Sequence, residues 1–192
     1  MMKINHTAIS TAGALASVAI AFPSIVSHPA ENTALIGAVA VGGFFGAILP
    51  DYDIKIPVSV STFVFRTLFT WIPRWKKNAK SAGHRTYSHC LLAVLFLITS
   101  MMVTGYFAGY GGVVFFLTFG ILFGAIFHII ADMTTVSGIP LFWPHSKEKH
   151  HILPAWMRIV TGKTKFEHLY ALILVFISLF IFFSRGTAGA LL

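Results

Sequence analysis

Five long apolar runs, almost free of charged residues, limit most strongly how this chain can fold. They cover approximately residues 7–27, 33–50, 90–108, 111–131 and 169–184. A helix needs about 20 apolar residues to cross the hydrocarbon core of a bilayer. Only 10% of the 192 residues are charged, against about 25% in a soluble domain. The sequence therefore predicts an all-α fold: a polytopic helical membrane protein with about five transmembrane helices, forming one domain over residues 1–192.

A sixth apolar segment, residues 56–72, is interrupted by Arg66. Because an arginine near the middle of a bilayer costs several kcal/mol, we expect a helix that lies in the membrane interface, with a re-entrant segment as the alternative. Tryptophan side chains commonly anchor at the same depth. The chain has four of them: Trp71, Trp75, Trp143 and Trp156.

Glycines are concentrated in the second and fourth runs. Gly120 and Gly124 form a pattern of small residues four apart, which lets two helices approach closely. We therefore expect these two helices in the interior of the bundle.

The basic residues indicate the orientation. The formal net charge is +8, and every Lys and Arg except Arg185 lies at the N-terminus or in the two long connections, residues 51–88 and 132–168. Connections of up to about 60 residues that are rich in Lys and Arg mark the cytoplasmic side. We therefore expect a cytoplasmic N-terminus and a periplasmic C-terminus. Anionic lipid headgroups account for this charge, and no nucleic acid partner is expected.

This topology brings seven His and Asp residues to one membrane level. The candidates are His6, Asp51, Asp53, His84, His89, His128 and Asp132. His128 and Asp132 are four residues apart and share one helical face. Imidazoles and carboxylates without thiols suit Zn²⁺, with Mn²⁺ or Fe²⁺ as alternatives. The sequence therefore predicts a site for one to three divalent metal ions, since seven ligands exceed the three typical of one catalytic zinc.

Each of these residues also has an ordinary interpretation. His128 and Asp132 could share a hydrogen bond within the helix, and Asp51 could belong to a helix-terminal turn. His145, His150 and His151 are expected to be solvated loop residues or interfacial anchors. Glu167 and His168 open the fifth run without an assigned role. The convergence of several ligand types at one level favours the metal site.

Five motifs together resemble a known family. They are His6-Thr7, Leu-Pro-Asp-Tyr-Asp at 49–53, His-Arg-x-x-Ser-His at 84–89, His-x-x-x-Asp at 128–132 and Thr-Thr-Val-Ser-Gly-Ile-Pro-Leu-Phe-Trp-Pro at 134–144. Over about residues 1–145 the chain resembles the YdjM-like family of inner-membrane metal-dependent hydrolases. That family usually has Thr-His-Ser where this chain has Ser88-His89-Cys90. The order of ligands is also distantly similar to zinc-dependent phospholipase C and the P1-type nucleases, which implies phosphoester hydrolysis.

The leading hypothesis is a metal-dependent hydrolase that is embedded in membrane lipid. It would cleave a phosphoester of a lipid or lipid-linked substrate. Asp53 would act as the base if one ion binds, and Arg85 suits a phosphate oxygen, although Arg85 could equally be a topology determinant. One alternative is a metal-ion transporter or sensor, which would need polar residues near the bilayer midplane. The other is a non-catalytic membrane scaffold that a metal ion holds together.

Overall fold

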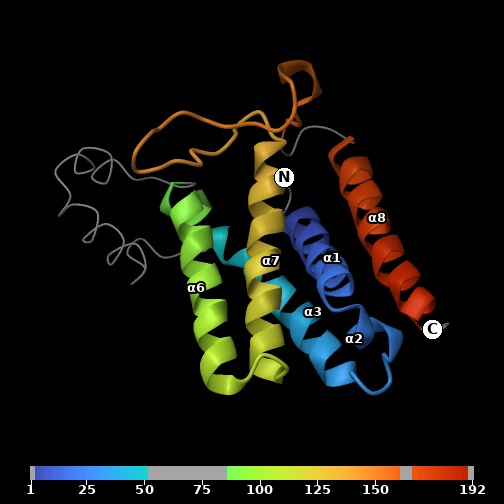
Figure 1. Ribbon diagram of the computed structural model, residues 1–192. Coiled ribbons are helices and arrows are strands. Elements are labelled where there is room, and N and C mark those ends of the chain that lie inside the picture. The colour runs from blue at the N-terminus through green and yellow to red at the C-terminus, as the bar shows by residue number, and fades with distance from the viewer. Residues whose placement is uncertain (1–2, 52–85, 161–165, 190–192) are drawn as a thin grey trace.

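The computed structural model describes residues 3–51, 86–160 and 166–189, in which helices lie side by side in a bundle (Figure 1). Within these ranges the only pairings of strand type are two isolated bridges, Thr135 with Ile159 and Ile139 with His150. The predicted all-α fold is therefore confirmed. The predicted interfacial segment, residues 56–72 with Trp71 and the nearby Trp75, lies outside the described residues.

Four helices are long and apolar enough to cross a bilayer. They are α1 (Lys3–Ala21), α6 (Leu91–Ala108), α7 (Val113–Met133) and α8 (Phe166–Gly189). The second predicted span corresponds to α3 (Thr33–Ile48), an apolar helix of only 16 residues. At 1.5 Å per residue α3 is about 24 Å long, which is less than the thickness of a typical hydrocarbon core.

The first apolar run is not one helix, as the sequence had suggested, but two. Helix α1 ends at Ala21, and the short helix α2 (Pro23–Ser27) follows. Phe22 between them has φ −136° and ψ 66°. The cause is Pro23, whose ring disfavours a helical conformation at the preceding residue and removes a backbone donor. Helix α1 also begins earlier than predicted, so that His6 lies within it.

Glycines bring α3 and α7 into backbone contact. A Cβ atom on Gly42 would meet the carbonyl oxygen of Leu117, and one on Gly120 would meet the carbonyl oxygen of Val39. Close packing at Gly120 and Gly124 is therefore confirmed. The interior differs in one respect from the prediction, because α1 is as buried as α7, whereas α6 and α8 bury only 6% and 11% of their residues.

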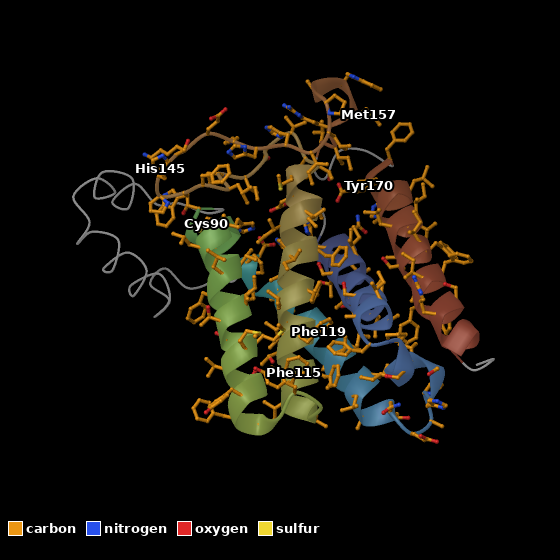
Figure 2. The ribbon with its side chains drawn as sticks, viewed as in Figure 1. Cys90, Phe115, Phe119, His145, Met157 and Tyr170 are labelled. Carbon is orange, nitrogen blue, oxygen red and sulfur yellow. The ribbon has the colours of Figure 1, made fainter. Side chains whose placement is uncertain are left out.

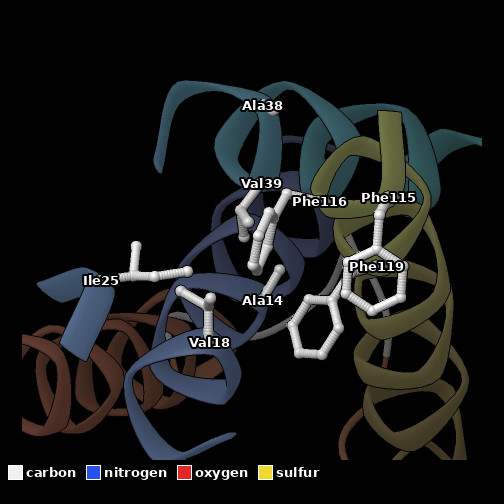
Figure 3. Close-up of a cluster of buried hydrophobic side chains, with 8 residues drawn as sticks. All are labelled: Ala14, Val18, Ile25, Ala38, Val39, Phe115, Phe116 and Phe119. Atoms are coloured by element: carbon white, nitrogen blue, oxygen red, sulfur yellow. The ribbon is translucent and has the colours of Figure 1, made fainter. Parts of the chain in front are cut away.

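Aromatic side chains fill the half of the bundle where α7 begins. Phe115, Phe116 and Phe119 pack against Ala14 and Val18 of α1, and Val39, Ala38 and Ile25 complete the cluster (Figure 3). This apolar core fixes the helices relative to one another. It leaves the other end of the bundle, where α7 ends and α1 begins, for the polar residues.

Residues 134–160 form an irregular segment that covers this polar end (Figure 1). The backbone N–H of Leu91 donates to the carbonyl of Leu141 at 2.8 Å, which ties the segment to the start of α6. Trp143 is only 1% exposed, so its predicted role as a membrane anchor is wrong: its indole is part of the packing beneath the segment. Trp156, in contrast, is 83% exposed.

The histidines of this segment differ in their surroundings. His145 is exposed, as expected of a loop residue. His150 and His151 are half-buried: the ring of His150 packs on Phe142, and Nδ1 of His151 lies 3.1 Å from the carbonyl oxygen of Thr135. These two side chains therefore hold the segment together and are not simply solvated.

Candidate metal centre

Four parts of the chain place five of the predicted ligands together at the polar end. His6 comes from the second turn of α1, Asp51 from the turn after α3, and His89 from the short helix η2 (Tyr87–His89) that precedes α6. His128 and Asp132 come from the last two turns of α7, on one face. The sequence favours the turn that carries Asp51, because Pro50, two residues after the end of α3, has no backbone N–H with which to continue the helix.

Asp132 lies at the middle of the cluster. Its Oδ1 is 3.4 Å from Nε2 of His6, and its Oδ2 is 3.2 Å from Nε2 of His89 and 3.8 Å from Nε2 of His128. Oδ1 of Asp51 approaches the same histidines from another side, at 3.6 Å from His128 and 3.9 Å from His89. The rings of His6 and His128 are neighbours, with centroids 4.3 Å apart and planes tilted by 32°.

These atoms form two groups that could each hold a metal ion. One consists of His6, His128 and Asp132 and the other of Asp51, His89 and His128, with all donor atoms of a group within 4.8 Å of one another. Ligands at 2.0–2.1 Å around a tetrahedral zinc are about 3.3 Å apart, close to the separations observed. Nε2 of His128 is buried, and its distances to both carboxylates are longer than hydrogen bonds. The donor set therefore fits a divalent cation.

The five ligands differ in exposure: four are buried and Asp51 is partly exposed. His6, His89, His128 and Asp132 are at most 3% exposed. The side chain of Asp51 is 22% exposed. Asp51 is therefore the most accessible of the five ligands.

Three groups at this end of the bundle, all outside the membrane-spanning helices, have shifted pKa values. Burial lowers the pKa of His89, so its imidazole is neutral at neutral pH, which is the form that binds metals. Burial alone would raise the pKa of Asp51, but the neighbouring His128, His89 and His6 hold it below its ordinary value. Burial raises the pKa of Cys90, which keeps this neighbouring thiol protonated and a poor ligand.

Ser88 orients one of the histidines. Its hydroxyl lies 2.9 Å from Nδ1 of His89, which leaves Nε2 directed at Asp132 and Asp51. A hydrogen bond of this kind fixes the tautomer and ring orientation of a metal-binding histidine.

A second polar group lies beside His6 and was not recognised from the sequence. Nδ2 of Asn5 donates to Oε1 of Glu167 at 3.3 Å, and Oδ1 of Asn5 lies 3.3 Å from Nδ1 of His168. Glu167 is only 1% exposed. The signal was present, since Asn5 adjoins His6 and Glu167 is an acidic residue at the start of an apolar helix. These contacts tie α8 to α1 next to the cluster.

Three predicted site residues, Asp53, His84 and Arg85, lie outside the described residues. The five that the structure describes belong to four of the motifs that carried the family resemblance. Comparison with known proteins agrees: the family model described as YdjM inner membrane protein matches residues 1–191. The chain belongs to the YdjM family.

Two curated relatives support this assignment. The inner membrane protein YdjM of Escherichia coli strain K12 and that of Shigella flexneri are each 31% identical to this chain over 126 residues. The match covers 60% of this chain and 58% of each relative, so the chain spans less than two thirds of the length of these YdjM proteins. No solved structure matches the chain. Membership of the YdjM inner-membrane family agrees with the four long apolar helices.

Proposed function

We propose that this YdjM family member is a membrane-bound, metal-dependent hydrolase that acts on a phosphoester of a lipid or lipid-linked substrate. One observation carries the proposal: four buried His and Asp side chains meet a fifth, Asp51, that is partly exposed. A centre with one accessible side is what a catalytic metal site needs, whereas a purely structural site is closed.

The residues of the cluster have distinct roles in this proposal. His6, His89, His128, Asp132 and Asp51 would hold the metal, with zinc as the first choice and Mn²⁺ or Fe²⁺ as alternatives. A divalent ion held there acts as a Lewis acid and activates water for hydrolysis at neutral pH. Ser88 keeps Nε2 of His89 directed into the site. Asp51, on the open side, is placed to accept a hydrogen bond from an incoming water or hydroxyl group.

The two possible groups of ligands share His128. They are compatible with one ion bound by several of the five residues or with two adjacent ions, so metal analysis must supply the number. The proposal also keeps two roles for residues outside the described segments. Asp53 would act as the base if one ion binds, and Arg85 would bind a phosphate oxygen.

A lipid substrate suits the position of the cluster. The ligands lie at the end of the bundle, next to the starts of α6 and α8 and the end of α7, which are all candidate membrane spans. A headgroup could reach this depth while its acyl chains stay among apolar helices. The concentration of Lys and Arg in the connections at this end supports a cytoplasmic orientation in the bacterial inner membrane.

The apolar core favours hydrolysis over metal transport. Below the cluster the interior between α1, α3 and α7 is filled by Phe115, Phe116, Phe119 and aliphatic side chains (Figure 3). A transporter would place ionisable residues near the midplane, and the central turns of the described helices α1, α3, α6, α7 and α8 carry no Asp, Glu, Lys, Arg or His.

The test is hydrolysis by the purified full-length chain, reconstituted in bilayers that contain phospholipids and lipid-linked phosphates. We expect release of a phosphate or headgroup product that stops on chelation and returns with added Zn²⁺ or Mn²⁺. The His128→Ala variant should bind no metal and produce no product while inserting into the membrane. Metal-loaded protein that cleaves none of these phosphoesters would contradict the proposal.

A further inference from the structure

An apolar groove lies between residues 153–160 and the first turns of α8, away from the five ligands. Its cavity volume is about 460 Å³, within the range of pockets that hold small molecules, about 300–1,000 Å³. Met157 and Ile159 line one side, and Leu169 and Ile173 line the other. Met157 and Tyr170 mark its two walls in Figure 2. Among the described lining residues, only Trp156, Arg158 and Tyr170 carry a polar group.

The groove is continuous with the outward face of a membrane-spanning helix. Leu169 and Ile173 are 52% and 48% exposed, and further along α8 Phe176 and Phe180 are even more exposed. Because α8 is a candidate span, this apolar face contacts acyl chains in the bilayer. A lipid can therefore enter the groove from the membrane without crossing water.

Arg158 supplies a fixed positive charge at this groove. Its Nε donates to the carbonyl oxygen of Leu153 at 3.1 Å, which holds the guanidinium in place and leaves its terminal nitrogens as donors. Among the described residues no carboxylate pairs with it. A guanidinium matches a phosphate group in geometry and charge.

Trp156 strengthens the link with the membrane interface. Its side chain lines the groove and is 83% exposed. An exposed indole beside the start of a membrane span is typical of the headgroup level. The groove thus combines apolar walls, a guanidinium and an exposed indole, which suit the acyl chain, the phosphate and the interfacial position of a phospholipid.

We propose that this groove binds one anionic phospholipid, whose acyl chain lies against Ile159, Leu169 and Ile173 and whose phosphate pairs with Arg158. Backbone hydrogen bonds connect the segment that forms the groove to the end of α7, which carries His128 and Asp132. The N–H of Ile159 donates to the carbonyl of Thr134 at 3.0 Å, and the N–H of Ile152 donates to that of Met133, also at 3.0 Å. Met133 and Thr134 are the two residues that follow Asp132 in the chain. The inference concerns binding and does not depend on the proposed hydrolysis.

The experiment is native mass spectrometry of the full-length chain in mild detergent, with phosphatidylglycerol or phosphatidylcholine of identical acyl chains. We expect one phosphatidylglycerol to remain bound per chain, with at least about tenfold preference over phosphatidylcholine, as a charged hydrogen bond would give. Arg158→Gln should remove this preference, and Arg158→Lys should retain most of it. Arg185→Gln removes the same charge at the other, exposed end of α8 and should change nothing.

A second pair of variants tests the apolar wall. Ile173→Trp fills the groove from α8 and should abolish retention of both lipids. Phe180→Trp places an indole on the same lipid-facing helix away from the groove lining and should leave retention intact.

Equal retention of the two lipids by the wild type, or unchanged lipid retention in both Arg158→Gln and Ile173→Trp, would overturn the inference. A dimer that Ile173→Trp dissociates would assign the groove to a second copy of the chain instead. Lipid binding without phosphoester cleavage would refute the proposed hydrolysis alone, and cleavage without retained lipid would refute the groove alone.

Discussion

Nε2 of His89 lies 3.2 Å from Oδ2 of Asp132, and both side chains are fully buried. The other oxygen of the same carboxylate lies 3.4 Å from Nε2 of His6. A carboxylate taken out of water costs several kcal/mol unless a charge of opposite sign compensates it. Burial lowers the pKa of His89, so this imidazole contributes a dipole and not a full charge at neutral pH. A cation among these side chains would supply the missing charge.

The first prediction concerns metal content. We expect the chain, purified gently and without chelators, to contain at least about one divalent ion, because its donors match zinc coordination. Asp132→Asn and His128→Ala should each lose the metal, as measured by elemental analysis. His145→Ala removes an exposed histidine of the covering segment and should keep it. Wild-type protein free of divalent metal would contradict the prediction.

The second prediction separates the orientation of His89 from its presence. Ser88→Ala removes the hydroxyl 2.9 Å from Nδ1 of His89 and should weaken metal affinity by about 10–100-fold, the usual cost of losing such a partner. Ser88→Thr keeps a hydroxyl and should retain affinity. Competition with a zinc-binding dye measures both variants. Equal affinities would show that Ser88 does not position the imidazole.

The sequence predicted the helices well because their apolar composition determines them. Their ends depend on local chemistry, and the break at Phe22 follows from Pro23, which is visible in the sequence. The shared level of His6, Asp51, His89, His128 and Asp132 follows from alternating helix directions. The distances between these five side chains do not follow from the helix directions. They depend on how closely α3 and α7 approach each other at Gly42 and Gly120.

The covering segment could not be predicted. Residues 134–160 contain little regular structure, and their path depends on contacts between distant parts of the chain. The sequence predicted Trp143 to be an interfacial anchor, but this side chain is buried because the segment folds over the bundle. The contact of Asn5 with Glu167 similarly requires α8 to dock beside α1.

The third prediction concerns helix packing. Gly120→Ala places a Cβ against the carbonyl oxygen of Val39 and 2.9 Å from the backbone nitrogen of Gly43. Backbone atoms cannot move aside easily, so we expect a loss of about 1–3 kcal/mol in the free energy of unfolding, as for other overpacked cores. Denaturation in mixed micelles gives the value.

Gly37→Ala is the matched control for that change. A Cβ on Gly37 would have no neighbour within 4 Å, and alanine is favoured over glycine in a helix by about 0.5–1 kcal/mol. This variant should be as stable as the wild type or slightly more stable. Equal destabilisation by both variants would mean that α3 and α7 do not pack through Gly120.

The fourth prediction concerns orientation. Lys149 lies in the segment that covers the candidate metal centre, and Glu31 lies in the connection between α2 and α3 at the opposite end (Figure 1); both are exposed. The native Cys90 is 0% exposed and should give little background with an impermeant maleimide. In intact cells we expect labelling of Glu31→Cys from the periplasm, whereas Lys149→Cys should react only after the inner membrane is permeabilised. This follows from the Lys and Arg residues that accumulate on the side of the centre. The reverse pattern would place the five His and Asp side chains at the periplasmic face and would exclude a substrate in the cytoplasmic leaflet.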